Sequence, residues 1–294
     1  MTDPFQVMGI VNVTPDSFSD GGSFLDADSA IAHALTLVEE GAQIVDIGGE
    51  STRPGAEPVP EAVERQRVVP VIEGLRAAGC EAELSIDTSK AAVASAALAA
   101  GATFVNDVTA LRGDPSMAAV VAGSGARCCL MHMLGEPRTM QVDPCYDEVV
   151  ADVRSFLRSR MQFAIEHGIA EDRILLDPGI GFGKTVAHNL ELLRRLDEIT
   201  ELGPPVVIGT SRKSFLGVIA GEQEAGDRLA GTIATNVIAY ERGASVFRVH
   251  DVAAVVDALR VAAATVPAPW RKTTTSSTTP TTETTRIRER PSPR

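Results

Sequence analysis

The sequence predicts an α/β protein, a (β/α)8 TIM barrel forming a single domain with a disordered C-terminal tail. Eight short apolar runs recur along the chain, and helix-like stretches separate them. Most runs are continuously apolar, which indicates parallel strands covered on both faces. Eight strand–helix units fit a closed barrel of about 250 residues. The predicted strands are 6–13, 43–48, 82–87, 103–108, 127–132, 173–178, 205–210 and 245–250.

A polar residue lies near the end of each predicted strand, which is the third observation behind the barrel. In a barrel these ends converge on one mouth, where active sites lie. A doubly wound open sheet is the main alternative, because strands and helices alternate there too. The count of eight and the shared position of the polar residues favour the barrel. These residues are Asn12, Asp46, Asp87, Asn106, His132, Asp177, Ser211 and His250.

Composition excludes several classes of function. The 294 residues carry a formal net charge of −12, which makes binding to nucleic acid a poor expectation. No stretch reaches the roughly 20 apolar residues of a membrane span, and no signal peptide is evident, so we expect no membrane contact and a cytoplasmic protein. The four cysteines match no zinc spacing and are expected to be reduced thiols, with Cys128 and Cys129 in the core.

The end of the chain differs in composition from the rest. Residues 1–267 carry the strand–helix alternation and are expected to form the barrel domain. Residues 268–294 are rich in Thr, Ser, Pro and Arg, and cannot bury a core. We therefore expect a disordered tail.

Two long polar loops follow the first two predicted strands, at 9–22 and 48–60. Either could be an ordinary turn. Together they have the length and composition of active-site lids. Arg53, between Thr52 and Pro54, offers a planar set of donors suited to carboxylate or phosphate.

Carboxylates and amides are expected to point into the mouth from the middle strands, namely Asp87, Asn106, Asp107 and Asp177. Such groups suit a heterocycle that presents paired N–H donors and a carbonyl. Capping of the following helix is the alternative for any one of them. The stretch 181–184 lacks the spacing of a phosphate-binding loop, and we discount that interpretation.

A cationic group follows the last two strands, in an otherwise acidic chain. Lys213 comes after the seventh strand, and Arg248 and His250 share one face of the eighth. Barrels of this class often bind phosphate at this position. An anion site explains the cluster better than solvent contact.

Eight motifs in register resemble the dihydropteroate synthase family. The match runs in order from residue 6 to about 265 and covers the predicted barrel, while the tail has no counterpart. The motifs are NVTPDSFSDGG, DIGGESTRPGA, SIDT, VNDV, LMHMLGEPRTMQ, LLDPGIGFGK, SRKSFLG and RVHDV.

The resemblance implies a role for each matching position. Asn12 would ligate a Mg²⁺ cofactor, with Asp20 as a helper. Arg248 and His250 would bind the diphosphate together with Thr52 or Arg53. The pterin pocket would be formed by Asp46, Asp87, Asn106, Met131, Asp177, Phe182 and Lys213. The 4-aminobenzoate site would be shaped by Phe18, Thr52, Pro54 and Ser214.

The resemblance also implies a reaction and partners. A pterin-methyl diphosphate would lose diphosphate, and the aniline nitrogen of 4-aminobenzoate would attack the methylene carbon. Asp177, Lys213, Arg248, His250 and Asp20 would be the catalytic residues. Homodimers are common in the family and are expected here. A pterin-dependent methyltransferase domain is one alternative, but it would not need Arg53 or the SRKS and RVHD motifs. A catalytically silent pterin-binding paralogue is the other, and the intact Asn12, Lys213, Arg248 and His250 argue against it.

Overall fold

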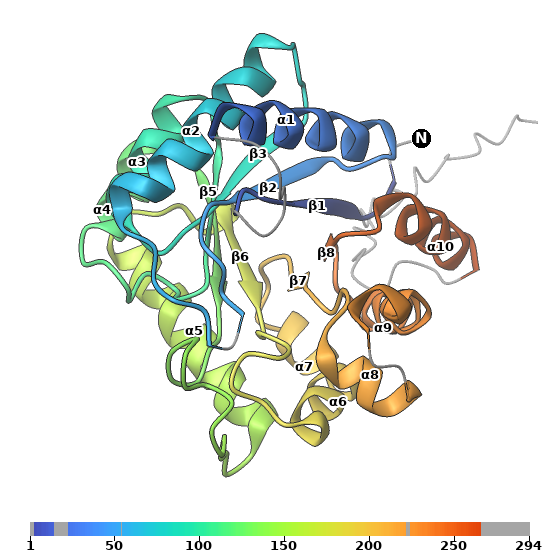
Figure 1. The fold of residues 1–294 in the computed structure, drawn as a ribbon. Helices are drawn as coiled ribbons and strands as arrows, with labels where there is room; N and C mark the ends of the chain where they lie inside the picture. Colours follow the sequence, from blue (N-terminus) through green and yellow to red (C-terminus); the bar gives the residue numbers. More distant parts are fainter. Residues whose placement is uncertain (1–2, 15–22, 54, 222–223, 266–294) are drawn as a thin grey trace, which may run out of the picture.

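Eight parallel strands form the centre of the molecule and helices surround them, as the (β/α)8 prediction requires (Figure 1). The computed structural model describes residues 3–14, 23–53, 55–221 and 224–265. The strands are β1 (Gln6–Asn12), β2 (Ile44–Gly48), β3 (Glu83–Asp87), β4 (Phe104–Asp107), β5 (Arg127–Met131), β6 (Ile174–Asp177), β7 (Val207–Ile208) and β8 (Val246–Val249).

The helices connect consecutive strands and cover the outside of the barrel (Figure 1). The α helices are α1 (Ser23–Glu39), α2 (Glu61–Ala77), α3 (Ala91–Ala99), α4 (Met117–Ser124), α5 (Val149–Glu166), α6 (Val186–Arg194), α7 (Asp197–Thr200), α8 (Ser214–Ala220), α9 (Leu229–Glu241) and α10 (Val252–Thr265). Two 3₁₀ turns, η1 (Glu171–Arg173) and η2 (Ala225–Arg228), precede β6 and α9.

Strand order runs β6-β5-β4-β3-β2-β1-β8-β7, so the first and last strands are neighbours. Gln6 lies opposite Val246 in the β1–β8 register. Outside the sheet, an ion pair of 3.2 Å between Arg260 Nη2 and Asp3 Oδ2 holds α10 next to the start of the chain. The two ends of the barrel sequence therefore lie together.

The join between β6 and β7 is the thinnest part of the wall. Strand β7 has two residues where six were predicted, and among the described residues an isolated bridge between Leu176 and Val206 closes the ring. Pro204 and Pro205 precede it and have no N–H to donate to a neighbouring strand. The barrel prediction is confirmed, but its seventh strand is much shorter than expected.

Two apolar layers stabilise the fold. The larger lies between the strands and the helices, where it includes Val45, Ile72 and Leu259. The smaller fills the barrel interior and consists of Met8, Ile44, Phe104, Cys129, Leu175, Val207 and Val246. Cys128 and Cys129 are buried free thiols, as expected, and burial raises the pKa of Cys128 to about 12.

The interior changes from apolar to polar along the strands, and this change positions the functional site. Residues two apart on a strand point to the same face. Four interior residues therefore have a polar partner two positions later, nearer the mouth. The pairs are Ile44 and Asp46, Phe104 and Asn106, Leu175 and Asp177, and Val246 and Arg248.

The predicted domain boundary at residue 267 stays a prediction, since residues 266–294 lie outside the described part of the chain. Within the described residues, no helix combines the length and the apolar composition that crossing a membrane requires.

Candidate active site

Arg248 is the centre of the polar layer. Its Nε donates to Asp46 Oδ2 at 2.6 Å and its Nη2 donates to Asp87 Oδ2 at 2.8 Å. Asp46 is fully buried, and it also accepts from Ser85 Oγ at 2.6 Å and from Asn106 Nδ2 at 3.0 Å. Four strands thus contribute to one network at the barrel mouth.

The network keeps the arginine charged. Burial opposes the charge of Arg248, but the carboxylates of Asp46 and Asp87 outweigh burial and raise the pKa of its guanidinium. For Asp87 the balance is reversed. Burial raises the pKa of Asp87 to about 7, and the attraction of Arg248 only partly opposes this rise. Asp87 is therefore a carboxyl whose protonation changes near neutral pH.

Asp177 and Lys213 face the same pocket from the other side. Asp177 Oδ1 accepts from the N–H of Gly179 at 2.7 Å, and burial raises the pKa of Asp177. The Nζ of Lys213 donates to the carbonyl of Ile180 and lies 4.4 Å from the centre of the Phe182 ring. Burial lowers the pKa of Lys213 to about 8, against the attraction of Asp177.

His250 is a buried histidine whose ring contacts Ser211. Burial and the charges of Arg248 and Arg212 lower the pKa of His250 to about 4. The backbone N–H of His250 donates to Ser211 Oγ at 3.2 Å, and the same oxygen lies 3.0 Å from Nδ1. The serine hydroxyl can donate to Nδ1 or accept from it; where it donates, the ring proton lies on Nε2 and is available to an anion.

An apolar wall closes the side of the pocket formed by β4, β5 and the loop after β6. Met131 belongs to a buried cluster with Val108, Met133 and Met140, and Phe182 packs against it. The predicted walls, Met131 and Phe182, are brought together by the fold.

The other predicted site residues lie around the polar layer or outside the described part of the chain. Asn12 ends β1 opposite Gly48. Arg53 is exposed, but its charge reaches His250 and lowers that pKa. Ser214 is exposed at the start of α8. Phe18, Asp20 and Pro54 lie outside the described residues.

Thr52 lines a different space. It borders an open cavity of about 420 Å³ between the loops after β2, β4 and β5, together with Arg112 and Arg138. None of Lys213, Arg248 and His250 lines that cavity.

The prediction that Asp107 points into the mouth beside Asn106 is wrong, because neighbours on a strand point to opposite faces. Asp107 instead holds its own loop: Oδ1 accepts from Thr109 N at 2.8 Å and Oδ2 from Leu111 N at 2.8 Å.

Sequence reasoning missed a buried lysine behind the pocket. Lys184 Nζ lies 2.9 Å from His132 Nδ1 and 3.0 Å from the Phe182 carbonyl. Burial lowers the pKa of Lys184 to about 7 and that of His132 to about 3. These contacts tie the loop that carries Phe182 to the end of β5. A lysine directly after G-F-G is the local signal in the sequence, but it does not indicate the His132 partner.

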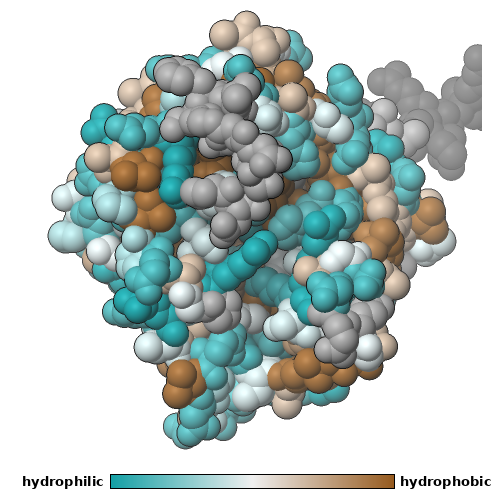
Figure 2. Space-filling model, viewed as in Figure 1, coloured by the Kyte–Doolittle hydropathy of each residue, from teal (hydrophilic) through white to brown (hydrophobic). Residues whose placement is uncertain are grey.

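Hydrophilic residues gather near the centre of the face shown in Figure 2. Among the described residues, no three His, Cys, Asp or Glu side chains come together as a metal-binding group. The buried carboxylates and the amide described above can recognise a flat heterocycle. Arg248, His250 and Lys213 can recognise an anion.

Comparison with known proteins agrees with this chemistry. The family model for pterin binding enzymes matches residues 8–250. Dihydropteroate synthase of Haemophilus influenzae is 44% identical over 263 residues, covering 90% of this chain and 94% of that protein. The enzyme of Escherichia coli is 45% identical over 266 residues, with coverage of 90% and 93%.

Solved structures give the same result. Xanthomonas albilineans dihydropteroate synthase with 4-aminobenzoic acid has a TM-score of 0.84 at 48% identity, covering 90% of this chain and 98% of that one. The same enzyme with 7,8-dihydropteroate has a TM-score of 0.81 at 48% identity, with coverage of 90% and 95%. The chain therefore belongs to the pterin-binding enzyme family, as one of its dihydropteroate synthases.

Proposed function

We propose that the polar layer at the barrel mouth carries out dihydropteroate synthesis by binding the pterin ring on its carboxylates and the departing diphosphate on its cations. The observation that carries this assignment is Arg248, fixed by Asp46 and Asp87 at the boundary between the two groups. In the reaction the C–O bond between the pterin methylene and diphosphate breaks. A C–N bond to the aniline nitrogen forms, and that nitrogen loses a proton.

Asp87, Asn106 and Asp177 would hold the pterin. Ionised carboxylates accept paired N–H donors, and an amide can donate and accept at once. Asn106 already donates to Asp46, which leaves its amide oxygen for a ligand. Negative charge here also favours the positive charge that develops on the methylene as the leaving group departs.

The diphosphate would be bound on the other side of Arg248. Arg248 uses Nε and Nη2 for its hydrogen bonds to Asp46 and Asp87, and no described residue is hydrogen-bonded to its Nη1. Nη1 and the Nε2–H of His250 would stabilise the charge on the leaving group, with Arg53 from the second loop. Lys213 would bond the pterin between Asp177 and the Phe182 ring.

Asn12 would hold the Mg²⁺ cofactor, with Asp20 as a helper that lies outside the described residues. Mg²⁺ keeps several waters and typically takes one or two protein ligands plus phosphate oxygens, so one amide oxygen at the end of β1 fits it. Bound there, the ion would neutralise charge on the diphosphate.

Phe18, Thr52, Pro54 and Ser214 would shape the aminobenzoate site. Ser214 at the start of α8, directly after Lys213, supports that position for the second substrate. Thr52 borders the open cavity between the loops after β2, β4 and β5.

A homodimer and a cytoplasmic location complete the proposal. Helices α8 and α9 present exposed apolar side chains, Val218 at 71%, Ile219 at 55% and Ile238 at 42% exposed, which would suit a second copy. Sedimentation velocity tests this: Ile219→Glu should shift the protein toward monomer, whereas a monomeric wild type would contradict it. The free buried thiols fit a reducing compartment.

The experiment measures diphosphate release from 6-hydroxymethyl-dihydropterin diphosphate in Mg²⁺, with and without 4-aminobenzoate, for wild type and Arg248→Ala. We expect aminobenzoate-dependent release that Arg248→Ala lowers by roughly 10²–10³-fold, as for loss of one transition-state donor. Arg260→Ala, an exposed arginine in an ion pair on α10, is the matched control and should retain full activity. Unchanged turnover in Arg248→Ala would overturn the assignment.

A further inference from the structure

Arg212, between Ser211 and Lys213, has a backbone conformation that side chains other than glycine rarely adopt. Its φ is +58°, in the left-handed region. Lys213 N donates to the carbonyl of Thr210 at 3.2 Å, which closes a four-residue turn with Arg212 at its third position. Turns with positive φ there normally carry glycine. An arginine at this position needs a compensating interaction.

Four interactions hold Arg212 in place. Its backbone N–H donates to Thr232 Oγ1 at 3.1 Å, and its carbonyl accepts from Arg228 Nη1 at 2.9 Å. Its guanidinium forms a two-pronged pair with Asp251: Nε to Oδ2 at 3.0 Å and Nη2 to Oδ1 at 2.5 Å. Paired bonds of this kind fix direction as well as distance.

The neighbours of this turn are the residues that bind substrate. Ser211 Oγ contacts both the N–H and the Nδ1 of His250. Lys213, on the other side, reaches the Ile180 carbonyl and the Phe182 ring. Asp251 directly follows His250 in the chain. One ion pair thus joins the loop after β7 to the loop after the neighbouring strand β8.

We propose that Arg212 is a positioning residue, whose pairing with Asp251 stabilises the left-handed turn and thereby places Lys213 for the pterin and His250 for the diphosphate. The inference rests on the roles proposed above for Lys213 and His250. Glycine would adopt this turn without strain, but it has no side chain to link the two loops. Arginine at this position supplies that link.

The test compares four variants: Arg212→Ala, Arg212→Gly, Asp251→Asn, and the double variant Arg212→Ala with Asp251→Asn. Readouts are kcat, the KM for pterin diphosphate and Tm, on the full chain. We expect Arg212→Ala to lower kcat/KM by roughly 10²-fold, the size typical of a displacement of about 1 Å at a reacting group. Arg212→Gly should recover roughly tenfold of this loss, because glycine adopts positive φ without strain.

Coupling between the two residues gives the sharper measurement. If Arg212 and Asp251 act through one pair, the double variant should be no worse than Arg212→Ala alone. Additive losses on a logarithmic scale would overturn the proposal, as would Arg212→Gly being no better than Arg212→Ala. If Arg212→Ala fails to fold, Arg212→Gly with and without Asp251→Asn gives the same comparison: a further loss in the double variant equal to that of Asp251→Asn in wild type would overturn the coupling.

Controls separate this proposal from the roles it rests on. Arg242→Ala removes an exposed arginine whose nearest acidic partner, Asp197, is 3.9 Å away, and should leave every readout unchanged. Lys213→Ala and His250→Ala should each lower kcat/KM. If both kept wild-type activity, the substrate-binding roles would fail; if both lost activity while Arg212→Ala did not, the positioning role alone would fail.

Discussion

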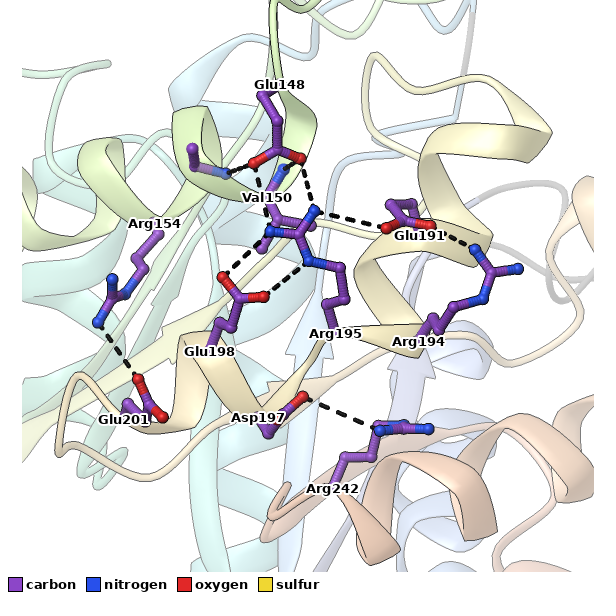
Figure 3. A network of polar contacts seen from close by, with 11 residues as sticks. Glu148, Val150, Arg154, Glu191, Arg194, Arg195, Asp197, Glu198, Glu201 and Arg242 are labelled. Atoms are coloured by element: carbon purple, nitrogen blue, oxygen red, sulfur yellow. Dashed lines mark hydrogen bonds and ion pairs between the residues drawn. The ribbon is translucent and has the colours of Figure 1, made fainter.

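Arg195 and Arg248 each contact two or more carboxylates, but the two networks differ in burial. Arg195 contacts Glu148, Glu191 and Glu198 on the outer surface (Figure 3). Arg248 contacts two carboxylates, of which Asp46 is fully buried. The side chain of Arg195 is 35% exposed and Glu148 is 44% exposed, so water and salt compete for every bond of the outer network.

The outer network stabilises a helix end, whereas the inner network positions charge at the barrel mouth. Glu148 begins α5 by accepting from Val150 N at 3.2 Å and Ala151 N at 2.8 Å, and Arg195 connects this cap to the segment between α6 and α7 (Figure 3). The inner network instead holds charge in a place that water reaches poorly. The number of ion pairs is therefore a poor guide to their importance, because burial decides what each one contributes.

The largest effect is expected from Asp46→Asn. Three donors converge on this carboxylate, and an amide would place its own N–H groups against one of them. Breaking a buried ion pair in this way costs about 3–5 kcal/mol of unfolding free energy, and kcat/KM should fall with it. Urea unfolding measures the first quantity. Asp197→Asn, at an exposed pair, is the control, and equal stability of the two variants would contradict the comparison.

Asp87 should give a pH dependence of opposite sign in two measurements. Its pKa is raised to about 7 from an ordinary value of 3.8, so its contribution to stability is present at low pH and lost as pH rises through about 7. Pterin binding should tighten over the same interval, since only the carboxylate accepts paired N–H donors. Thermal unfolding and calorimetric titration between about pH 5 and pH 8 check both. In Asp87→Asn both trends should disappear.

Lys184 should show a smaller effect, shifted to higher pH. Its lowered pKa of about 7 means that the unfolded chain binds more protons between about pH 7 and its ordinary value of 10.5, so wild type gains stability as pH rises through that window. Lys184→Met should lack this gain. It should also raise the KM for pterin diphosphate several-fold, because the Phe182 loop loses its link to His132. A Tm difference between the two proteins that is independent of pH would argue against a buried titrating lysine.

The smallest effect is expected from Arg195→Ala. We expect a slight decrease in Tm in low salt, no change in kcat, and a decrease that vanishes near 1 M NaCl, where charges are screened beyond about 3 Å. A salt-independent loss of Tm would mean that the outer network acts through packing and not through charge.

The sequence predicted the barrel because apolar strand runs and polar strand ends are both local signals. It also predicted the polar layer, since Asp46, Asn106 and Asp177 lie near the ends of predicted strands and Arg248 shares a face of the eighth strand with His250. Which of two neighbouring polar residues points inward is a matter of strand phase, and Asp107 was misjudged for that reason. The seventh strand was predicted to begin at Pro205, because the apolar run begins there, whereas β7 begins at Val207, after both prolines.

The supporting residues were harder to find. Ser85 and Ser211 have small hydroxyls that look like ordinary turn or strand residues until the partner appears in space. Lys184 meets His132 across 52 positions of sequence, and Arg212 meets Asp251 across 39. A single sequence contains no signal for such pairings.

The thin join between β6 and β7 makes this barrel a good subject for circular permutation. The first and last described segments already lie together, at the β1–β8 pair and the Arg260–Asp3 contact. A chain opened in the turn 201–205 and joined by a short linker between residues 265 and 3 would interrupt one isolated bridge and keep all the continuous strand pairs. Such a permutant should fold with its mouth intact, and its new termini would lie where the original ring is weakest.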